Sequence, residues 1–434
     1  MSTSLIRPAL FRVLAAAVAL GSLLCNANAA SDTTMFRGGP THPGVYASDA
    51  PTNSATVKWR FKTDSRVIGS AAIADGAVYF GSFDGSFYAV DENSGGLRWK
   101  FDTDGAITSS AAIEKGIAYF GSFDGNFYAV DLATGKLKWK FATKGERRFA
   151  AKHIHGIDPP AETMPDFWDF YLSSPVVSEG AVYFGSGDGN VYKLNADSGE
   201  KMWEFPTGDV VHSSPSLANG VIYIGSFDRF FYAIDASTGK EKWRYKTGED
   251  PVIHNQEGIT SSPAVADGTV FFGCRNATVY ALDAATGNLK WSQKGDRGWV
   301  SVSPAVHDGK VYVATGSDKA LKVLDATSGK VLYAKPVRAG TFSSVAVVGN
   351  HILLATFDGK LHSIDPQADT ETVIYPVGEQ PPPAPINMET NFYDDHVAAM
   401  VERLKQGIFL SSPVVADHLI FIGTTDGYML AIGN

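Results

Sequence analysis

Residues Ile107 to Phe141 read ITSSAAIEKGIAYFGSFDGNFYAVDLATGKLKWKF, which is four short apolar runs separated by turn signals. The pairs Lys-Gly, Asp-Gly and Thr-Gly stand between the runs. Asp-Gly between alternating apolar runs is a strong hairpin signal, because the tightest hairpin turns need residues with positive φ. The stretch therefore predicts a four-stranded antiparallel meander. Such a sheet cannot bury both faces alone, so we expect further copies beside it.

The copies are present along the chain. The preceding segment reads VIGSAAIADGAVYFGSFDGSFYAVDENSGGLRWKF, and Trp59, Trp99 and Trp139 follow one another at intervals of 40 residues. This period is typical of propeller blades. Eight repeats begin near residues 67, 107, 172, 211, 259, 300, 341 and 410.

The eighth repeat stops after three strands, whereas residues 57–61 (VKWRF) form a spare fourth strand. We predict an all-β fold, a single eight-bladed β-propeller of four-stranded antiparallel blades, closed by an N-terminal strand that completes the C-terminal blade. Closure removes the open sheet edges that favour aggregation. The recurring Trp residues are predicted to pack between blades, and the recurring turn Asp residues are explained by turn chemistry.

Residues 1–30 are expected to be a secretory signal peptide, with Arg7 and Arg12 before an apolar run and a small-residue cleavage site. The alternative is a lipoprotein signal ending at Cys25. Residues 31–434 should then form the propeller in the periplasm or outside the cell. Residues 35–46 (MFRGGPTHPGVY) are expected to be an irregular segment draped over the surface. The net charge of −9 disfavours nucleic acid as a partner.

Three insertions interrupt the repeats, at residues 144–171, 248–258 and 366–409. Each follows a fourth strand and precedes the next first strand. In an antiparallel blade, these connections share one face with the turns between strands two and three. We therefore expect all three insertions to crowd one face, which we interpret as the working surface. Apolar spacing within residues 397–404 predicts a short amphipathic helix packed on the propeller.

The same face should collect cations and imidazoles that would hold an anionic or carboxylated ligand. The alternative is that these side chains pair with acidic residues and fix the insertions in place. The acidic residues are Glu249, Asp250, Asp158 and Asp166. No catalytic motif appears, and a pair of imidazoles two residues apart is too few for a metal site, so we predict neither. The ligand-binding candidates are Arg147, Arg148, His153, His155, His212, His254, Asn255, Gln256, Arg297 and Trp299.

The repeat S-S-P-A-V-x-D-G-x-V-Y-F-G-S-x-D-G-x-x-Y-A-L-D-A-x-T-G-x-x-x-W, seen from Ser173, Ser213 and Ser261 onward, resembles the pyrroloquinoline-quinone (PQQ) enzyme repeat. The resemblance spans almost all of the chain after residue 30 and implies an eight-bladed propeller. It leaves function open, because the repeat occurs in two kinds of protein. Quinoprotein alcohol dehydrogenases have adjacent cysteines at the cofactor and a calcium site with a catalytic Asp. This chain has no adjacent cysteines and no position that we can match to that Asp.

The second kind is the non-catalytic BamB-like propeller of the outer-membrane β-barrel assembly machinery, which this chain resembles more closely. We therefore favour a monomeric periplasmic scaffold without a cofactor. It would bind an envelope protein partner, and reach the outer membrane through it, or bind a small anionic ligand. The alternative is a PQQ-dependent quinoprotein dehydrogenase, with calcium, whose divergent active site lies at the funnel.

Overall fold

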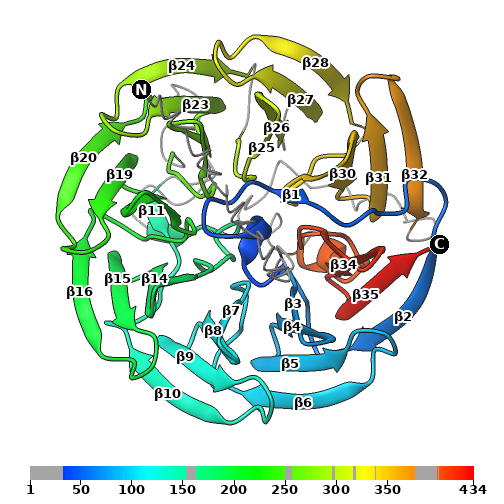
Figure 1. Cartoon of the computed structure of the whole chain (residues 1–434), viewed down its shortest axis with the longest axis horizontal. Coiled ribbons are helices and arrows are strands. Elements are labelled where there is room, and N and C mark those ends of the chain that lie inside the picture. Colours follow the sequence, from blue (N-terminus) through cyan, green and yellow to red (C-terminus); the bar gives the residue numbers. More distant parts are fainter. Residues whose placement is uncertain are drawn as a thin grey trace, which may run out of the picture. The chain divides into compact units, whose positions relative to one another are not determined.

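A computed structural model describes residues 33–152, 163–249, 257–295, 299–315, 319–337, 339–376, 398 and 400–434. Eight four-stranded antiparallel sheets surround a central axis (Figure 1), which confirms the predicted eight-bladed propeller. The expected signal peptide lies outside the described residues. Within the described residues, no helix has the length and apolar character needed to cross a membrane.

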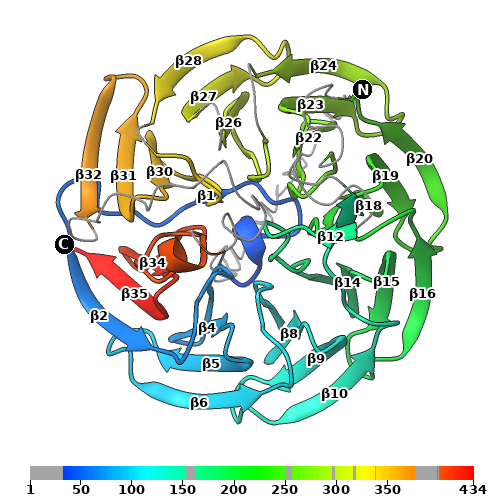
Figure 2. The ribbon, with the colours of Figure 1, turned by 180° about the vertical axis from the view of Figure 1, so that it is seen from behind.

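Each blade runs from a three-residue strand at the axis to a longer strand at the rim (Figures 1 and 2). Blades 1 to 4 comprise β3 (Ala72–Ala74), β4 (Ala77–Gly81), β5 (Ser86–Asp91) and β6 (Leu97–Asp102); β7 (Ala112–Glu114), β8 (Ile117–Gly121), β9 (Asn126–Asp131) and β10 (Leu137–Ala142); β13 (Val176–Ser178), β14 (Ala181–Gly185), β15 (Asn190–Asn195) and β16 (Lys201–Pro206); and β17 (Ser216–Ala218), β18 (Val221–Gly225), β19 (Phe230–Asp235) and β20 (Glu241–Lys246).

Blades 5 to 8 continue the ring in the same order. They comprise β21 (Ala264–Ala266), β22 (Thr269–Cys274), β23 (Thr278–Asp283) and β24 (Leu289–Lys294); β25 (Ala305–His307), β26 (Lys310–Thr315), β27 (Ala320–Asp325) and β28 (Val331–Pro336); β29 (Ala346–Val348), β30 (His351–Ala355), β31 (Lys360–Asp365) and β32 (Thr370–Pro376); and β33 (Val414–Ala416), β34 (Leu419–Gly423), β35 (Tyr428–Gly433) and β2 (Thr56–Lys62).

The last blade closes the ring as predicted. β2, from the N-terminal part of the chain, pairs antiparallel with β35, and Trp59 lies opposite Ala431. In the inner strands nearly every residue is buried, as in β4, whereas β2 alternates between exposed and less exposed residues. Inner strands are covered by blades on both faces and therefore read as continuous apolar runs. The rim strands have water on one side and so alternate.

The recurring Trp residues pack between neighbouring blades, which confirms their predicted structural role. The indole nitrogen of Trp139 donates to the carbonyl of Ala196 at 2.9 Å in the next blade. Its ring lies against Gly199, whose φ is +73°, and a Cβ there would come within 2.6 Å of the ring. The same pairs recur as Trp59/Gly95, Trp99/Gly135, Trp203/Gly239, Trp243/Gly287 and Trp291/Gly329.

The turn Asp residues are also structural, as predicted. Asp124 accepts hydrogen bonds from the amide of Asn126 at 2.8 Å and from the hydroxyl of Tyr128 at 2.6 Å. It also accepts the amide of Asp104, in the connection between blades, at 3.3 Å. The carboxylate therefore ties the turn between strands two and three to the neighbouring connection.

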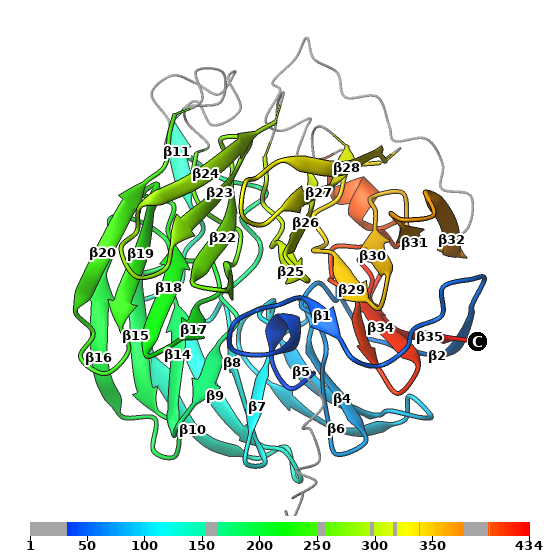
Figure 3. The same ribbon diagram turned by 45° about the horizontal axis from the view of Figure 1, so that its top comes forward.

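The N-terminal segment is not draped over the surface, which corrects the sequence-based expectation for residues 35–46. With Thr33 and Thr34 just before it, the N-terminal segment spans residues 33–46. It contains η1 (Phe36–Gly38) and β1 (Val45–Tyr46), and it runs across the axis (Figures 1 and 3). Its carbonyls accept backbone amides from the first strands of six blades, and β1 adds in parallel to β29. The segment therefore closes one end of the axial channel. The amides belong to Ile73, Ile113, Leu217, Val265, Val306 and Val347.

Candidate functional site

The first insertion covers the other end of the channel. It forms the hairpin of β11 (Ala150–Lys152) and β12 (Thr163–Pro165), and residues 166–171 then return across the funnel mouth. Residues 400–404 of the third insertion are helical, as predicted, with Met400 and Leu404 buried (Figure 2). Phe170 packs with both of them in one apolar cluster. The described parts of these two insertions therefore share one face, as the topology predicted.

A buried imidazole fastens the first insertion to blade 4. His212 Nδ1 lies 2.6 Å from Asp169 Oδ1, and His212 Nε2 lies 2.8 Å from Glu146 Oε1. All three side chains are almost fully buried. Burial alone would lower the pKa of His212, but the carboxylates of Asp169 and Glu146 outweigh it and raise the pKa to about 10. His212 is therefore an imidazolium at neutral pH, held between the two ends of the insertion.

A buried guanidinium fastens the same insertion to blade 5. Arg275 pairs with Asp166, and both side chains are almost fully buried. The guanidinium carbon lies 3.8 Å from the ring centroid of Trp299, a cation–π contact. Sequence reasoning missed Arg275, although a signal was present. Arg275 follows the second strand of its blade at the position where Phe83 and Phe227 stand in other repeats.

Aromatic side chains fill the mouth above the axis. Trp168 stacks on Phe342 with ring centroids 4.7 Å apart. The hydroxyl of Tyr171 donates to the carbonyl of Leu410 at 2.8 Å, and burial raises the pKa of this phenol. Both residues come from the first insertion, whereas their partners belong to blades 7 and 8. The insertion therefore spans the mouth from one side of the ring to the other.

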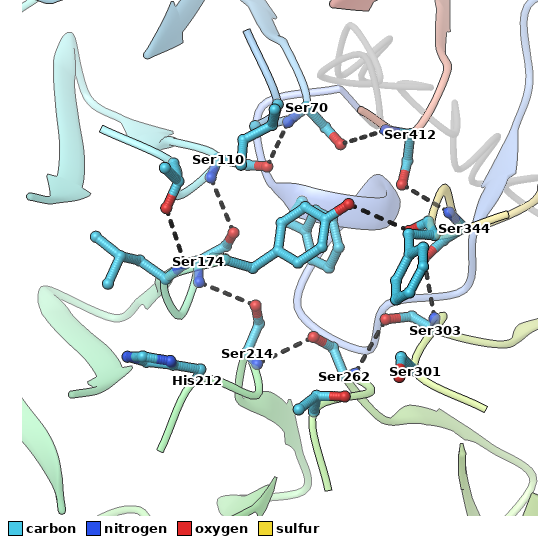
Figure 4. Close-up of a pocket in the computed structure, with 18 of the residues that line it drawn as sticks. Ser70, Ser110, Ser174, His212, Ser214, Ser262, Ser301, Ser303, Ser344 and Ser412 are labelled. Carbon is cyan, nitrogen blue, oxygen red and sulfur yellow. Dashed lines mark hydrogen bonds between the residues drawn. The ribbon is translucent and has the colours of Figure 1, made fainter. Parts of the chain in front are cut away.

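Beneath this cap, a closed circle of serines surrounds the axis (Figure 4). The amide of each serine donates to the hydroxyl oxygen of the serine in the next blade, at 2.9 to 3.3 Å. In this serine ring no hydroxyl is a donor in any hydrogen bond between described residues, so each can donate into the cavity. The ring consists of Ser70, Ser110, Ser174, Ser214, Ser262, Ser303, Ser344 and Ser412.

The axial cavity lies beneath the cap. About 700 Å³ is free of atoms, part of it open to solvent, which is within the size range of ligand pockets. Phe36 of the N-terminal segment lines the cavity together with His212, Arg275 and the serine ring. The cavity therefore offers hydroxyl donors, whereas its two cationic side chains are already paired with carboxylates.

Four predicted ligand-binding residues are described by the structure, and all four belong to this face. Arg147 pairs with Asp209 at 2.8 Å, and the guanidinium carbon of Arg148 lies 5.8 Å from the ring centroid of Phe123. His212 and Trp299 have the contacts given above. Arg147 and His212 therefore pair with carboxylates. This agrees with the alternative interpretation from the sequence, in which these cations fix the insertions in place instead of binding a ligand. Outside the described residues lie His153, His155, His254, Asn255, Gln256 and Arg297.

At the described ends of the second insertion, two carboxylates pair with an arginine of blade 4. Arg229 of blade 4 lies 2.8 Å from Glu249 and 2.9 Å from Glu257. The searched part of the chain, which leaves out the undescribed residues, contains no group of three His, Cys, Asp or Glu side chains that could hold a metal ion. Ligand binding by the predicted residues stays a prediction.

Fold and site together define a class: a closed eight-bladed β-propeller whose funnel is capped by its own first insertion. A family model described as outer membrane protein assembly factor BamB matches residues 17–159, 166–259 and 252–432. The chain therefore belongs to this family. A comparison with curated proteins found no match.

Solved structures of two functional kinds share the fold. BamB from Moraxella catarrhalis is 16% identical with a TM-score of 0.65, covering 88% of this chain and 100% of that chain. A europium-containing methanol dehydrogenase is 14% identical with a TM-score of 0.66, covering 91% and 90%. A quinohemoprotein alcohol dehydrogenase from Comamonas testosteroni is 15% identical with a TM-score of 0.65, covering 93% and 81%. At such identities the likeness shows the fold alone.

Proposed function

We propose that this chain is a non-catalytic scaffold of the cell envelope that binds a protein partner in outer-membrane protein assembly. The family match supports this function. One observation carries it furthest: Trp168 and Tyr171 of the first insertion cover the funnel mouth and reach partners in blades 7 and 8. A funnel covered by the chain itself leaves the outer surface of the insertions as the place for a partner. The periplasmic location and the signal peptide belong to this proposal.

The alternative, a PQQ-dependent dehydrogenase, is favoured by the likeness to solved dehydrogenase structures. PQQ is a flat ring system with several carboxylates, and a site for it needs unpaired cations. In the cavity, Arg275 is committed to Asp166 and to the face of Trp299, and His212 is committed to two carboxylates. These residues do not fit the cofactor.

The first test of the scaffold function is direct binding. The purified chain without residues 1–30 should retain the barrel subunit of the β-barrel assembly machinery from the same organism. Lys152→Glu, on the exposed hairpin strand β11, should weaken retention. Lys136→Glu is the matched control, because this exposed lysine lies in a turn between strands three and four on the opposite face. Retention that neither reversal changes, or no retention, would contradict binding through the insertion face.

The second test addresses the alternative. PQQ, with and without calcium, should leave the melting temperature unchanged, because a ligand that binds only the folded state must raise it. A saturable rise that requires calcium would instead support the dehydrogenase.

A further inference from the structure

A second hollow lies beside the axial cavity, on the same face of the ring. About 320 Å³ is free of atoms there, part of it open to solvent, which is at the small end of ligand pockets. Two guanidinium groups line it, Arg66 from the connection between β2 and β3 and Arg148 from the first insertion. The other lining residues are Ile68, Phe83, Phe167, Phe170, Leu404 and Leu410.

Neither of these two arginines has an acidic partner among the described residues, whereas three other arginines of the propeller face do. Arg147 pairs with Asp209, Arg229 with two glutamates and Arg275 with Asp166. Arg66 and Arg148 have only ring contacts, at 5.5 Å from the centroid of Phe83 and 5.8 Å from that of Phe123.

The positive charges are also close enough to affect each other. Burial lowers the pKa of Arg66, and the charge of Arg148 lowers it further. Guanidinium groups stay charged at neutral pH, so the pair is held together against its own repulsion. A bound anion would relieve this repulsion and satisfy donors that are partly removed from water.

The rest of the lining selects the kind of anion. The other described lining side chains are aromatic or aliphatic, and no carboxylate is among them. A fully hydrated inorganic ion would leave this apolar surface uncovered, whereas an organic acid would bury part of it.

We propose that Arg66 and Arg148 together bind the carboxylate of a small organic acid whose apolar group lies against Phe83, Phe167 and Phe170. The site lies outside the serine ring and is separate from the scaffold function proposed above. It brings together the first insertion, the third insertion and blade 1, so a bound acid would tie these segments to one another.

The test uses the chain without residues 1–30 and 3-phenylpropionate as the probe, followed by calorimetry and by melting temperature. Binding should be saturable and should raise the melting temperature. Arg66→Gln and Arg148→Gln should each weaken it about tenfold, which is about 1.4 kcal/mol, because each removes one charged hydrogen-bond donor. The double variant should lose binding. Arg98→Gln is the matched control, because Arg98 pairs with Asp91 on rim strand β6 outside the hollow, and it should bind normally.

Two further probes test the contribution of the ring and the contribution of the charge separately. 3-Phenylpropanamide has the ring without the charge, and acetate has the charge without the ring, and both should bind more weakly. The proposal is wrong if 3-phenylpropionate shows no saturable binding, if either control probe binds as tightly, or if a folded double variant binds unchanged. Folding of each variant is checked by its melting temperature without probe. If a variant does not fold, the affinities of the wild type for the three probes still test the proposal.

Discussion

The indole of Trp139 and the missing side chain of Gly199 form one structural unit at the scale of residues. The glycine occupies a backbone conformation with φ of +73°, and the ring fills the place where its Cβ would be. Between blades 6 and 7, both the indole and the glycine are replaced. Tyr333 replaces the indole, and its hydroxyl donates to Asp369 at 2.8 Å. Asp369 has φ of +49° and stands where the other blades have glycine.

The contribution of this packing can be measured with two alanine substitutions. Gly180 has φ of +74° and nothing within 4 Å of its Cβ position, so Gly180→Ala tests backbone strain alone. We expect that strain to cost about 1–2 kcal/mol. Gly199→Ala adds a clash with Trp139 and should cost a further ~1–3 kcal/mol. Urea unfolding of both variants measures the difference, and equal costs would show that the ring moves freely.

His212 should make stability depend on pH. Its folded pKa of about 10 lies above the unfolded value of about 6.5. Its contribution is therefore complete below about pH 6.5, decreases as the pH rises, and is absent above about pH 10. His212→Gln should cost roughly 3–5 kcal/mol at pH 7, because Glu146 and Asp169 stay buried without a cation. Between pH 7 and 10 the unfolding free energy should fall more steeply in the wild type, and parallel slopes would contradict this.

Part of this residue-level chemistry could be predicted from the sequence. His212 lies near the start of repeat four, where Thr108 stands in blade 2, and this place on the insertion-bearing face made it a predicted site residue. Its partners Glu146 and Asp169 lie inside the first insertion. The insertion has no counterpart in other repeats, so no alignment indicates which of its carboxylates turns inward.

At the scale of elements, the position of the N-terminal segment could not be predicted from the sequence. Its Gly and Pro residues suggest an irregular surface loop, yet its carbonyls complete the first strands of six blades. These strands are only three residues long and lie at the axis, where water would otherwise have to satisfy their amides. The need for such a partner follows from the fold and cannot be read from local propensity. Arg37 and His42 within the segment are buried.

His42 should make this segment sensitive to acid. Burial lowers its pKa to about 3, and the charge of Arg37 acts in the same direction. The unfolded chain then binds a proton more readily, so stability is complete above about pH 6.5 and falls as the pH decreases towards 3. His42 has φ of 52°, a conformation that Asn tolerates. His42→Asn should therefore remove the acid sensitivity without adding backbone strain.

Amide hydrogen exchange gives the readout. The amides of Ile113 and Leu217, which bond to the segment, should lose protection between pH 7 and pH 4.5 in the wild type and keep more of it in the variant. The amide of Phe120, inside a blade, serves as the internal control. The same loss of protection in both proteins would show that another group is responsible.

At the scale of the whole molecule, ring closure was the most predictable feature. Counting strands sufficed, because an incomplete last blade and a spare first strand must pair to remove two open edges. The pairing of β2 with β35 confirms this. The capped funnel could not be predicted in the same way, since it depends on contacts between segments that have no repeat to align.

Removing β35 should open the ring. Deletion of residues 428–434 leaves β2 and β34 without the strand between them. We expect loss of the cooperative thermal transition and association of the exposed edges, measured by calorimetry and light scattering. Deletion of the exposed Asn434 alone is the control and should leave both measurements unchanged. A monomeric truncated protein with the wild-type transition would show that closure contributes little.

The serine ring has a consequence for how such a molecule can change in size. Each blade contributes one amide and one hydroxyl, so every joint is the same head-to-tail link. Links of this kind form a closed circle whenever their rotations add up to a full turn, whatever their number. At six of the eight joints an indole packed on a glycine fills the wedge between the blades. If a repeat were duplicated or lost, the blades on either side could therefore be joined by the same link. Only the angle between neighbouring blades would have to change.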